Sequence, residues 1–146
     1  MSEVKVLSKE IIPVFIGFLN EGKSVRFKVS GHSMLPFFKH QKTIVTLNKK
    51  DSYYKYDVIL YMSNGLYKLH RIIKVNDDHF IVYGDALKDK EIIYQKDVIG
   101  YVEYHTGKKR NIYYKNNWYL FKVKLWILLK PFRRFLIKGL RKVKMI

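Results

Sequence analysis

Three residues far apart in the sequence have side chains that could together cleave a peptide bond. Ser33 lies in the segment S-G-H-S-M-L-P at residues 30–36, His70 in L-H-R-I-I, and Asp85 in G-D-A. Serine chemistry requires a hydroxyl in a defined turn, a base that takes its proton, and backbone N–H groups directed at the developing oxyanion. Glycine permits unusual backbone angles before Ser33, and proline stiffens the chain after it.

Each of these residues also has a plainer interpretation when it is taken alone. Ser33 could be an ordinary turn residue, and His70 could be a strand histidine that faces solvent beside Lys68 and Lys74. Asp85 could belong to a simple Gly-Asp turn. The combination of all three, and not any one of them, favours a catalytic interpretation.

The wider pattern resembles the signal peptidase I-like serine peptidases, a clan that also includes the self-cleaving SOS-type repressors. The resemblance covers about residues 24–103. Its motifs follow the family's order: G-x-S-M-x-P, then Y-D-V-I-L-Y, L-H-R-I-I, G-D-A and V-I-G-Y-V. The fold that this resemblance implies is mainly β, a coiled antiparallel, barrel-like sheet.

The resemblance also implies a role for each motif residue. One branch of the clan pairs serine with lysine, whereas the other has histidine in H-R-I, as this chain has at His70. Ser33 is then the nucleophile, His70 the general base and later the acid, and Asp85 the acidic partner. Asp89 is a second acidic candidate. Backbone N–H groups at Gly31 and Ser33 are implied to hold the oxyanion.

The chain departs from the family pattern at two turns and at its N-terminus. Gln41 and Lys42 stand where the family has Gly-Asp, and Tyr56 replaces glycine before Asp57. The apolar run at residues 11–19 is shorter than the roughly 20 residues that a membrane span needs. We therefore expect neither an N-terminal membrane anchor nor a secretory signal peptide. We also expect no DNA-binding domain before Ser33.

The elements expected from hydrophobic periodicity would bring these motifs together in one small sheet. Residues 8–21 have the pattern of a short helix. Strands are expected at residues 25–29, 43–47, 57–62, 66–75, 79–83, 97–104 and 110–115. Asn64-Gly65 between two apolar strands is a strong hairpin signal. We expect an N-terminal helix at 1–23, a β domain at 24–115 and a helical tail at 116–146.

Charge is concentrated at the C-terminal end of the chain. The net charge of the 146 residues is +17, and residues 105–146 contain 13 Lys and Arg without any acidic residue. Such a basic tail indicates contact with an anionic membrane or with nucleic acid. The absence of cysteine excludes disulfides, thiolate zinc sites and a cysteine nucleophile. The histidines lack metal-ligand spacing, so we expect no metal or cofactor.

The tail has a helical apolar stripe that Pro131 is expected to interrupt. The stripe consists of Trp118, Phe121, Leu125, Leu128, Phe132, Phe135, Gly139 or Leu140, and Val143. Three interpretations are open: a membrane-surface anchor, a nucleic-acid-binding segment, and a helix that packs on the sheet. The anchor is favoured because signal peptidases act at membranes. Its expected membrane contacts are Trp118, Phe121, Trp126, Phe132, Arg133 and Arg134.

Three functions remain as hypotheses. The first is a membrane-peripheral serine endopeptidase that removes a leader or signal segment from an exported peptide or protein. Its expected partners are a peptide substrate and an anionic membrane surface, not nucleic acid, and the basic tail favours the cytoplasmic face. A base with the ordinary histidine pKa of about 6.5 predicts activity that falls at lower pH. The second is a catalytically inactive relative that acts as a peptide-binding or membrane-bound partner protein. The third is a basic nucleic-acid-binding protein in which the β domain serves only as a scaffold.

Overall fold

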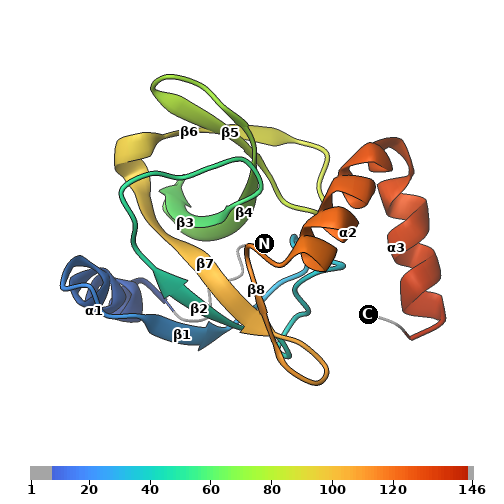
Figure 1. The fold of residues 1–146 in the computed structure, drawn as a ribbon, viewed down its shortest axis with the longest axis horizontal. Coiled ribbons are helices and arrows are strands. Elements are labelled where there is room, and N and C mark those ends of the chain that lie inside the picture. Colours follow the sequence, from blue (N-terminus) through green and yellow to red (C-terminus); the bar gives the residue numbers. More distant parts are fainter. Residues whose placement is uncertain (1–7, 145–146) are drawn as a thin grey trace.

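One antiparallel sheet of eight strands dominates the structure, a computed structural model that describes residues 8–144. The strands are β1 Val25–Lys28, β2 Ile44–Asn48, β3 Val58–Ser63, β4 Leu66–Val75, β5 His79–Tyr83, β6 Lys90–Tyr94, β7 Val98–Thr106 and β8 Asn111–Tyr113. Their order is β1-β2-β7-β3-β4-β5-β6, with β8 paired to β7 (Figure 1). The expectation of a mainly β, antiparallel fold is confirmed. The sheet is not closed into a barrel, because the strands at the two ends of this order are not paired with each other.

The central hairpin forms where the sequence predicts it. β3 and β4 pair from Val58↔Arg71 to Ser63↔Leu66. Asn64 and Gly65 join them with φ values of 52° and 76°, the left-handed angles that a tight hairpin turn requires. β3 is buried on both faces over its first four residues, which explains its unbroken apolar run.

Strand β7 connects the parts of the sheet because it pairs with three other strands. Its first half pairs with β3, from Tyr61↔Val98 to Ile59↔Tyr101. Its second half lies between β2 and β8, where His105 is opposite both Val45 and Ile112. The nine residues of β7 therefore join the motif-bearing strands β3 and β4 to the N-terminal pair β1 and β2.

The two faces of the sheet cover separate hydrophobic clusters. Leu60 and Leu69, which are directly opposite in the β3–β4 register, belong to the cluster that also packs against α1 and Met34. Ile59 and Ile72 belong to the second cluster, together with Phe80 on β5. Because successive strand residues point to opposite faces, Arg71 lies on the face of Leu69, whereas His70 lies on the face of Ile72.

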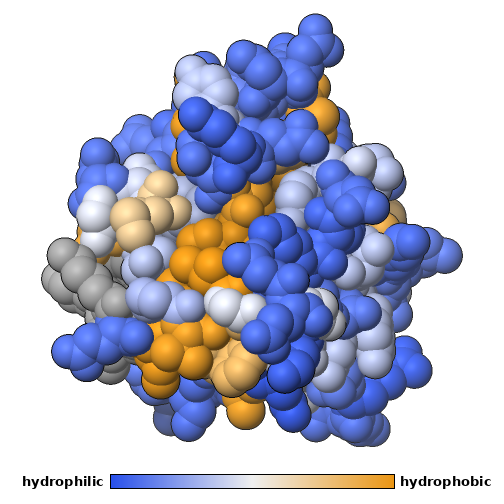
Figure 2. Space-filling model, turned by 90° about the vertical axis from the view of Figure 1, so that its left-hand side faces the viewer, coloured by the Kyte–Doolittle hydropathy of each residue, from blue (hydrophilic) through white to orange (hydrophobic). Residues whose placement is uncertain are grey.

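Helix α1, Ser8–Asn20, covers the β1 end of the sheet. It buries Ile12 and Leu19 in the first cluster but leaves Ile11, Val14 and Phe18 exposed. Figure 2 shows a band of hydrophobic surface among hydrophilic residues on this side of the molecule. Pro13 is the sixth residue of this helix, past the first turn, so α1 lacks the backbone hydrogen bond that a donor at this position would make.

The C-terminal tail forms two helices at the opposite end of the molecule from α1 (Figure 1). These are α2, Asn117–Leu128, and α3, Arg133–Lys142, with a short 3-10 turn at Lys130–Phe132 between them. The predicted interruption at Pro131 is confirmed. The side chain of Asn116 caps α2 by accepting a hydrogen bond from the N–H of Tyr119 at 2.9 Å.

The tail packs through a different face from the apolar stripe seen in the sequence. α2 buries Tyr119, Val123 and Trp126, and α3 buries Arg133. Most members of the stripe are exposed: Trp118, Phe121, Leu125, Leu128, Phe132, Phe135 and Val143. α2 is apolar on two faces, so periodicity alone could not show which face meets the sheet.

Strand β6 has no clear signal in the sequence, and we did not predict it. β6 lies at the end of the sheet, and Ile93 is its only fully buried residue, so its alternation is weak. Within residues 8–144, none of the helices has the length and apolar character needed to span a bilayer.

Candidate active site

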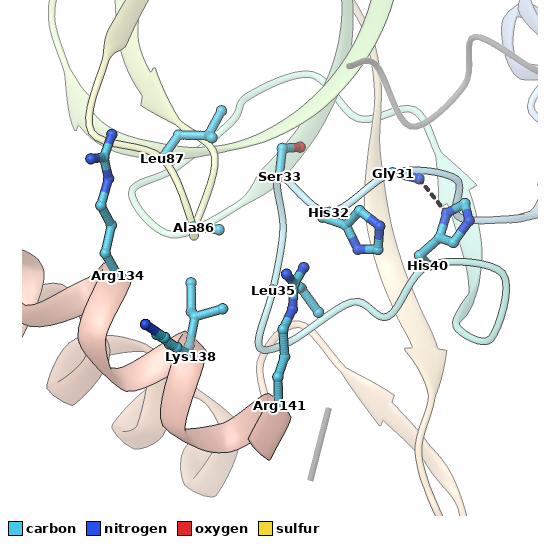
Figure 3. Close-up of a pocket in the computed structure, with 11 residues that line it drawn as sticks. Gly31, His32, Ser33, Leu35, His40, Ala86, Leu87, Arg134, Lys138 and Arg141 are labelled. Atoms are coloured by element: carbon cyan, nitrogen blue, oxygen red, sulfur yellow. Dashed lines mark hydrogen bonds between the residues drawn. The ribbon is translucent and has the colours of Figure 1, made fainter. Parts of the chain in front are cut away.

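Ser33 lies at the edge of a cavity of about 620 Å³, in the turn that follows β1. The residue is buried, and Gly31 two positions earlier adopts a φ of 100°, a left-handed angle that favours glycine. The cavity is bounded on the other side by α3 and by Leu87 (Figure 3). Its volume falls within the range of about 300–1,000 Å³ that is usual for ligand sites.

The G-D-A motif lies in the connection between β5 and β6 and contacts the backbone of Ser33. The N–H of Ala86 donates to the carbonyl oxygen of Ser33 at 2.9 Å. The N–H of Asp85 points at the sulfur of Met34, 3.4 Å away. A Cβ on Gly84 would lie 2.7 Å from the same Ser33 carbonyl oxygen. Two of the three predicted motifs are therefore adjacent, and Gly84 is required by this close approach.

Asp85 has a different partner from the one predicted. Its two carboxylate oxygens accept hydrogen bonds from Arg71 Nε at 2.9 Å and from Nη2 at 2.8 Å. Arg71 also donates to the carbonyl of Tyr56 and to the hydroxyl of Tyr119. Although burial disfavours the charge of Arg71, Asp85 and Tyr119 raise its pKa. Asp85 thus neutralises a buried arginine on the face of β4 opposite His70, where it fixes the G-D-A turn.

His70 meets a tyrosine on its own face of the sheet. The hydroxyl of Tyr61 and Nδ1 of His70 share a hydrogen bond of 2.7 Å, and the two rings are nearly perpendicular at 68°. Burial lowers the pKa of His70 to about 4, although Glu91 opposes this effect. The imidazole is consequently neutral at pH 7, which a general base requires. The predicted approach of the Ser33 hydroxyl to this ring stays a prediction.

Glu91 is the acidic residue nearest to His70 that sequence reasoning missed. Its Oε1 lies 3.9 Å from His70 Nδ1 and accepts a hydrogen bond from Lys68 Nζ at 2.7 Å. Burial would raise the pKa of Glu91, but hydrogen bonds from Lys68 and Ser63 lower it, so the carboxylate stays charged. The acidic candidate Asp89 is exposed just before β6. Glu91 lies two residues after Asp89, in β6. Its position beside His70 could have been predicted only if β6 had been recognised.

The N–H of Gly31 has a partner that conflicts with its predicted oxyanion role. It donates to Nδ1 of His40 at 2.7 Å (Figure 3). This bond holds the turn before Ser33 and engages the N–H, so Gly31 is not an oxyanion donor in this arrangement. The N–H of Ser33 stays the predicted donor.

Two of the predicted membrane contacts are structural residues of the site. Trp126 donates from its indole nitrogen to the carbonyl of Asp85 at 2.7 Å. Arg133 donates to the carbonyl of Leu87, and its guanidinium carbon lies 6.0 Å from the ring centre of Tyr83. Both side chains are buried, so their assignment to a membrane surface is wrong. Arg134 is exposed, but it lines the cavity.

The wall of the cavity opposite Ser33 is cationic. Arg134 extends from α3 toward Leu87 and Arg141 toward Leu35, while Lys138 lines the cavity between them (Figure 3). Burial and the charge of Arg141 lower the pKa of His32 on the facing loop. Leu35, Leu87 and other aliphatic side chains complete the lining. The arrangement is an apolar cavity with a serine on one side and positive charge on the other.

Comparisons of the chain with protein-family models, with curated proteins and with solved structures find no match. The function is therefore argued from the residues and geometry of the site.

Proposed function

We propose that the chain is a serine endopeptidase of the signal peptidase type, which removes a leader or signal segment from an exported peptide or protein at a membrane surface. The observation that carries this proposal is the position of Ser33. It lines a cavity of ligand size, and its own carbonyl is fixed by the G-D-A turn that the resemblance places in the same site. A serine in a mobile surface turn would have neither property.

In the proposed reaction, the Ser33 hydroxyl oxygen attacks the scissile carbonyl carbon while His70 takes the hydroxyl proton. His70 then gives this proton to the leaving amine as the peptide bond breaks. Water attacks the resulting ester, with His70 again as base, and the serine is released. No cofactor takes part in these steps.

Tyr61 and Glu91 replace Asp85 as the groups that support the base. A hydrogen bond from Nδ1–H of His70 to the Tyr61 hydroxyl leaves the lone pair on Nε2 for the serine proton. The charge of Glu91 at 3.9 Å favours the imidazolium that forms in the transition state. Asp85 supports the reaction indirectly because it positions the turn beneath Ser33.

The test is Ser33-dependent cleavage of a mixed library of synthetic signal-segment peptides, with new N-termini identified by mass spectrometry. Ser33→Ala and His70→Gln should each reduce cleavage by roughly a thousandfold or more. Ser30→Ala, at a buried serine of the same turn, and His79→Gln, at a half-buried histidine that does not line the cavity, are matched controls that should retain cleavage.

Cleavage that persists in Ser33→Ala, or that is lost equally in Ser30→Ala, would contradict the mechanism. Peptide binding without any cleavage would favour the alternative, an inactive relative that binds peptides. A fluorophosphonate probe on the same proteins gives an independent readout, since it labels only an activated serine.

A further inference from the structure

The charge at the cavity beside Ser33 is of one sign. None of the lining residues described is acidic, and α3 contributes Arg134, Lys138 and Arg141. These three lie four and three positions apart, so they share one face of the helix. Within residues 8–144, none of the salt bridges involves them. Three cations that have no acidic partner among the described residues therefore lie along one wall of a concave site.

We propose that this cavity binds an acidic segment of a peptide, with substrate carboxylates contacting Arg134, Lys138 and Arg141. The inference rests on the proposed function for the identity of the reacting serine, and it adds the class of substrate. The aliphatic side chains of Leu35, Leu87 and Ile137 would contact the peptide's apolar atoms between the carboxylates. Arginine is well suited to carboxylates because its planar guanidinium can donate two parallel hydrogen bonds.

The geometry of α3 favours a peptide over a lipid headgroup as the occupant. The cations line the cavity, whereas Phe135, which follows Arg134 in α3 and therefore points about 100° away from it around the helix axis, is exposed by 78%. A bilayer is broad and flat, so it would meet this exposed apolar side chain before it reached side chains that line a hollow. An extended chain can enter a hollow between a helix and a turn.

The test uses fluorescence anisotropy with two labelled probes, the acidic peptide (Glu-Ala)₄ and its uncharged match (Gln-Ala)₄, on the full chain with Ser33→Ala so that neither peptide is consumed. We expect the acidic probe to bind roughly tenfold or more tightly than the amide probe. The triple variant Arg134→Gln, Lys138→Gln, Arg141→Gln should bind the acidic probe as weakly as the amide probe.

A charge-matched control separates the cavity from the general basicity of the tail. Lys124→Gln, Lys142→Gln, Lys144→Gln removes the same charge from exposed positions outside the cavity and should retain acidic-peptide binding. Equal binding of the two probes, or equal loss in both triple variants, would overturn the inference. So would a cavity variant that keeps peptide binding but loses binding to phosphatidylglycerol vesicles, because its cations would then contact headgroups.

The inference and the proposed function can fail separately. Acidic-peptide binding without Ser33-dependent cleavage would remove the peptidase and leave an acidic-peptide receptor. If both hold, the peptides cleaved from the library should carry Asp or Glu close to the cleaved bond, and this preference should vanish in the cavity variant.

Discussion

His70 is a buried base whose proton affinity is set by its surroundings more than by its own chemistry. Burial lowers its pKa to about 4, well below the ordinary value of about 6.5 on which the sequence-based expectation of pH dependence rests. The base should therefore stay neutral, and catalysis should persist, at pH values where an exposed histidine is already protonated.

The same shift predicts how stability depends on pH. Between pH 6.5 and about 4 the unfolded chain takes up a proton at His70 that the folded chain does not, so stability falls as pH falls through this window. The loss should be on the order of 3 kcal/mol, since each tenfold change in proton affinity corresponds to about 1.4 kcal/mol. Urea denaturation at pH 7 and pH 4.5 measures the loss. His70→Gln should show a smaller loss than wild type, whereas the partly exposed His79→Gln should not. Equal pH dependence in wild type and His70→Gln would contradict this account.

Gly84 has no room for a side chain, and this gives a second prediction at the residue scale. A Cβ would lie 2.7 Å from the Ser33 carbonyl oxygen and 2.9 Å from Leu87. Gly84→Ala should displace the turn, lower stability by about 1–3 kcal/mol and reduce cleavage by roughly a hundredfold. Gly139→Ala, where nothing lies within 4 Å, should leave cleavage unchanged and serves as the control. Cleavage rates and urea denaturation measure both effects, and full activity in Gly84→Ala would refute the constraint.

The elements of the fold are joined at one buried ion pair. Arg71 on β4 contacts Asp85 after β5 and Tyr119 on α2, so three segments meet at one guanidinium. Either charge alone would be very unfavourable when buried this deeply, so the two charges are tolerated only as a pair.

Asp85→Asn should therefore cost about 3–5 kcal/mol of unfolding free energy, because it leaves Arg71 charged and buried. The double variant Arg71→Met, Asp85→Leu should recover most of this loss, since it removes both charges. Chemical denaturation of the two variants and wild type makes the comparison. If Asp85→Asn lowered the free energy of unfolding by less than about 1 kcal/mol, the Arg71–Asp85 pair would not be what holds these three segments together.

Most elements could be predicted from the sequence, because their signals are local. The Asn64-Gly65 turn and the alternation of β1 and β5 depend on neighbouring residues alone. β6 was missed because it follows a charged run and, at the end of the sheet, fully buries only Ile93. With β6 missing, Glu91 could not be placed beside His70.

The rest of the site depends on tertiary packing between distant segments, which local sequence patterns do not predict. Asp85 was assigned to His70 from motif order, but Asp85 pairs with Arg71, which the alternation of β4 turns to the face opposite His70. Trp126 and Arg133 are residue types common at membrane surfaces. Here, however, they donate hydrogen bonds to the carbonyls of Asp85 and Leu87 and so hold the segment that contains the G-D-A turn. Such pairings depend on which faces of distant segments meet.

At the scale of the whole molecule, the exposed stripe of the tail remains available for a membrane. Trp118 and Phe121 are stacked with ring centres 5.5 Å apart and are mostly exposed, as is Phe135. Lys122 Nζ lies 5.9 Å from the ring centre of Trp118, and exposed aromatic and basic side chains together are typical of helices that lie in the headgroup region.

The triple variant Trp118→Ser, Phe121→Ser, Phe135→Ser should weaken binding to phosphatidylglycerol vesicles by roughly tenfold or more, because each large apolar side chain contributes about 1.5–3 kcal/mol when buried. Stability should change by less than about 1 kcal/mol. A control with Ile92→Ser, Tyr94→Ser and Tyr113→Ser removes comparably exposed side chains from β6 and β8. Co-sedimentation measures the difference, and equal weakening in both variants would argue against the stripe.

The charges of α3 repel one another, and those at its N-terminus oppose the helix dipole. Five of its ten residues are cationic, none is anionic, and Arg133 and Arg134 lie at the end where the helix dipole disfavours positive charge. A bound acidic peptide would reduce the repulsion among these cationic side chains. Binding should therefore make α3 more ordered. Hydrogen exchange should accordingly slow at the amides of residues 133–142 when (Glu-Ala)₄ is added, and unchanged exchange would show that the helix is already rigid. Occupancy of the cavity would then be sensed along the whole of α3, from Arg133 to Lys142.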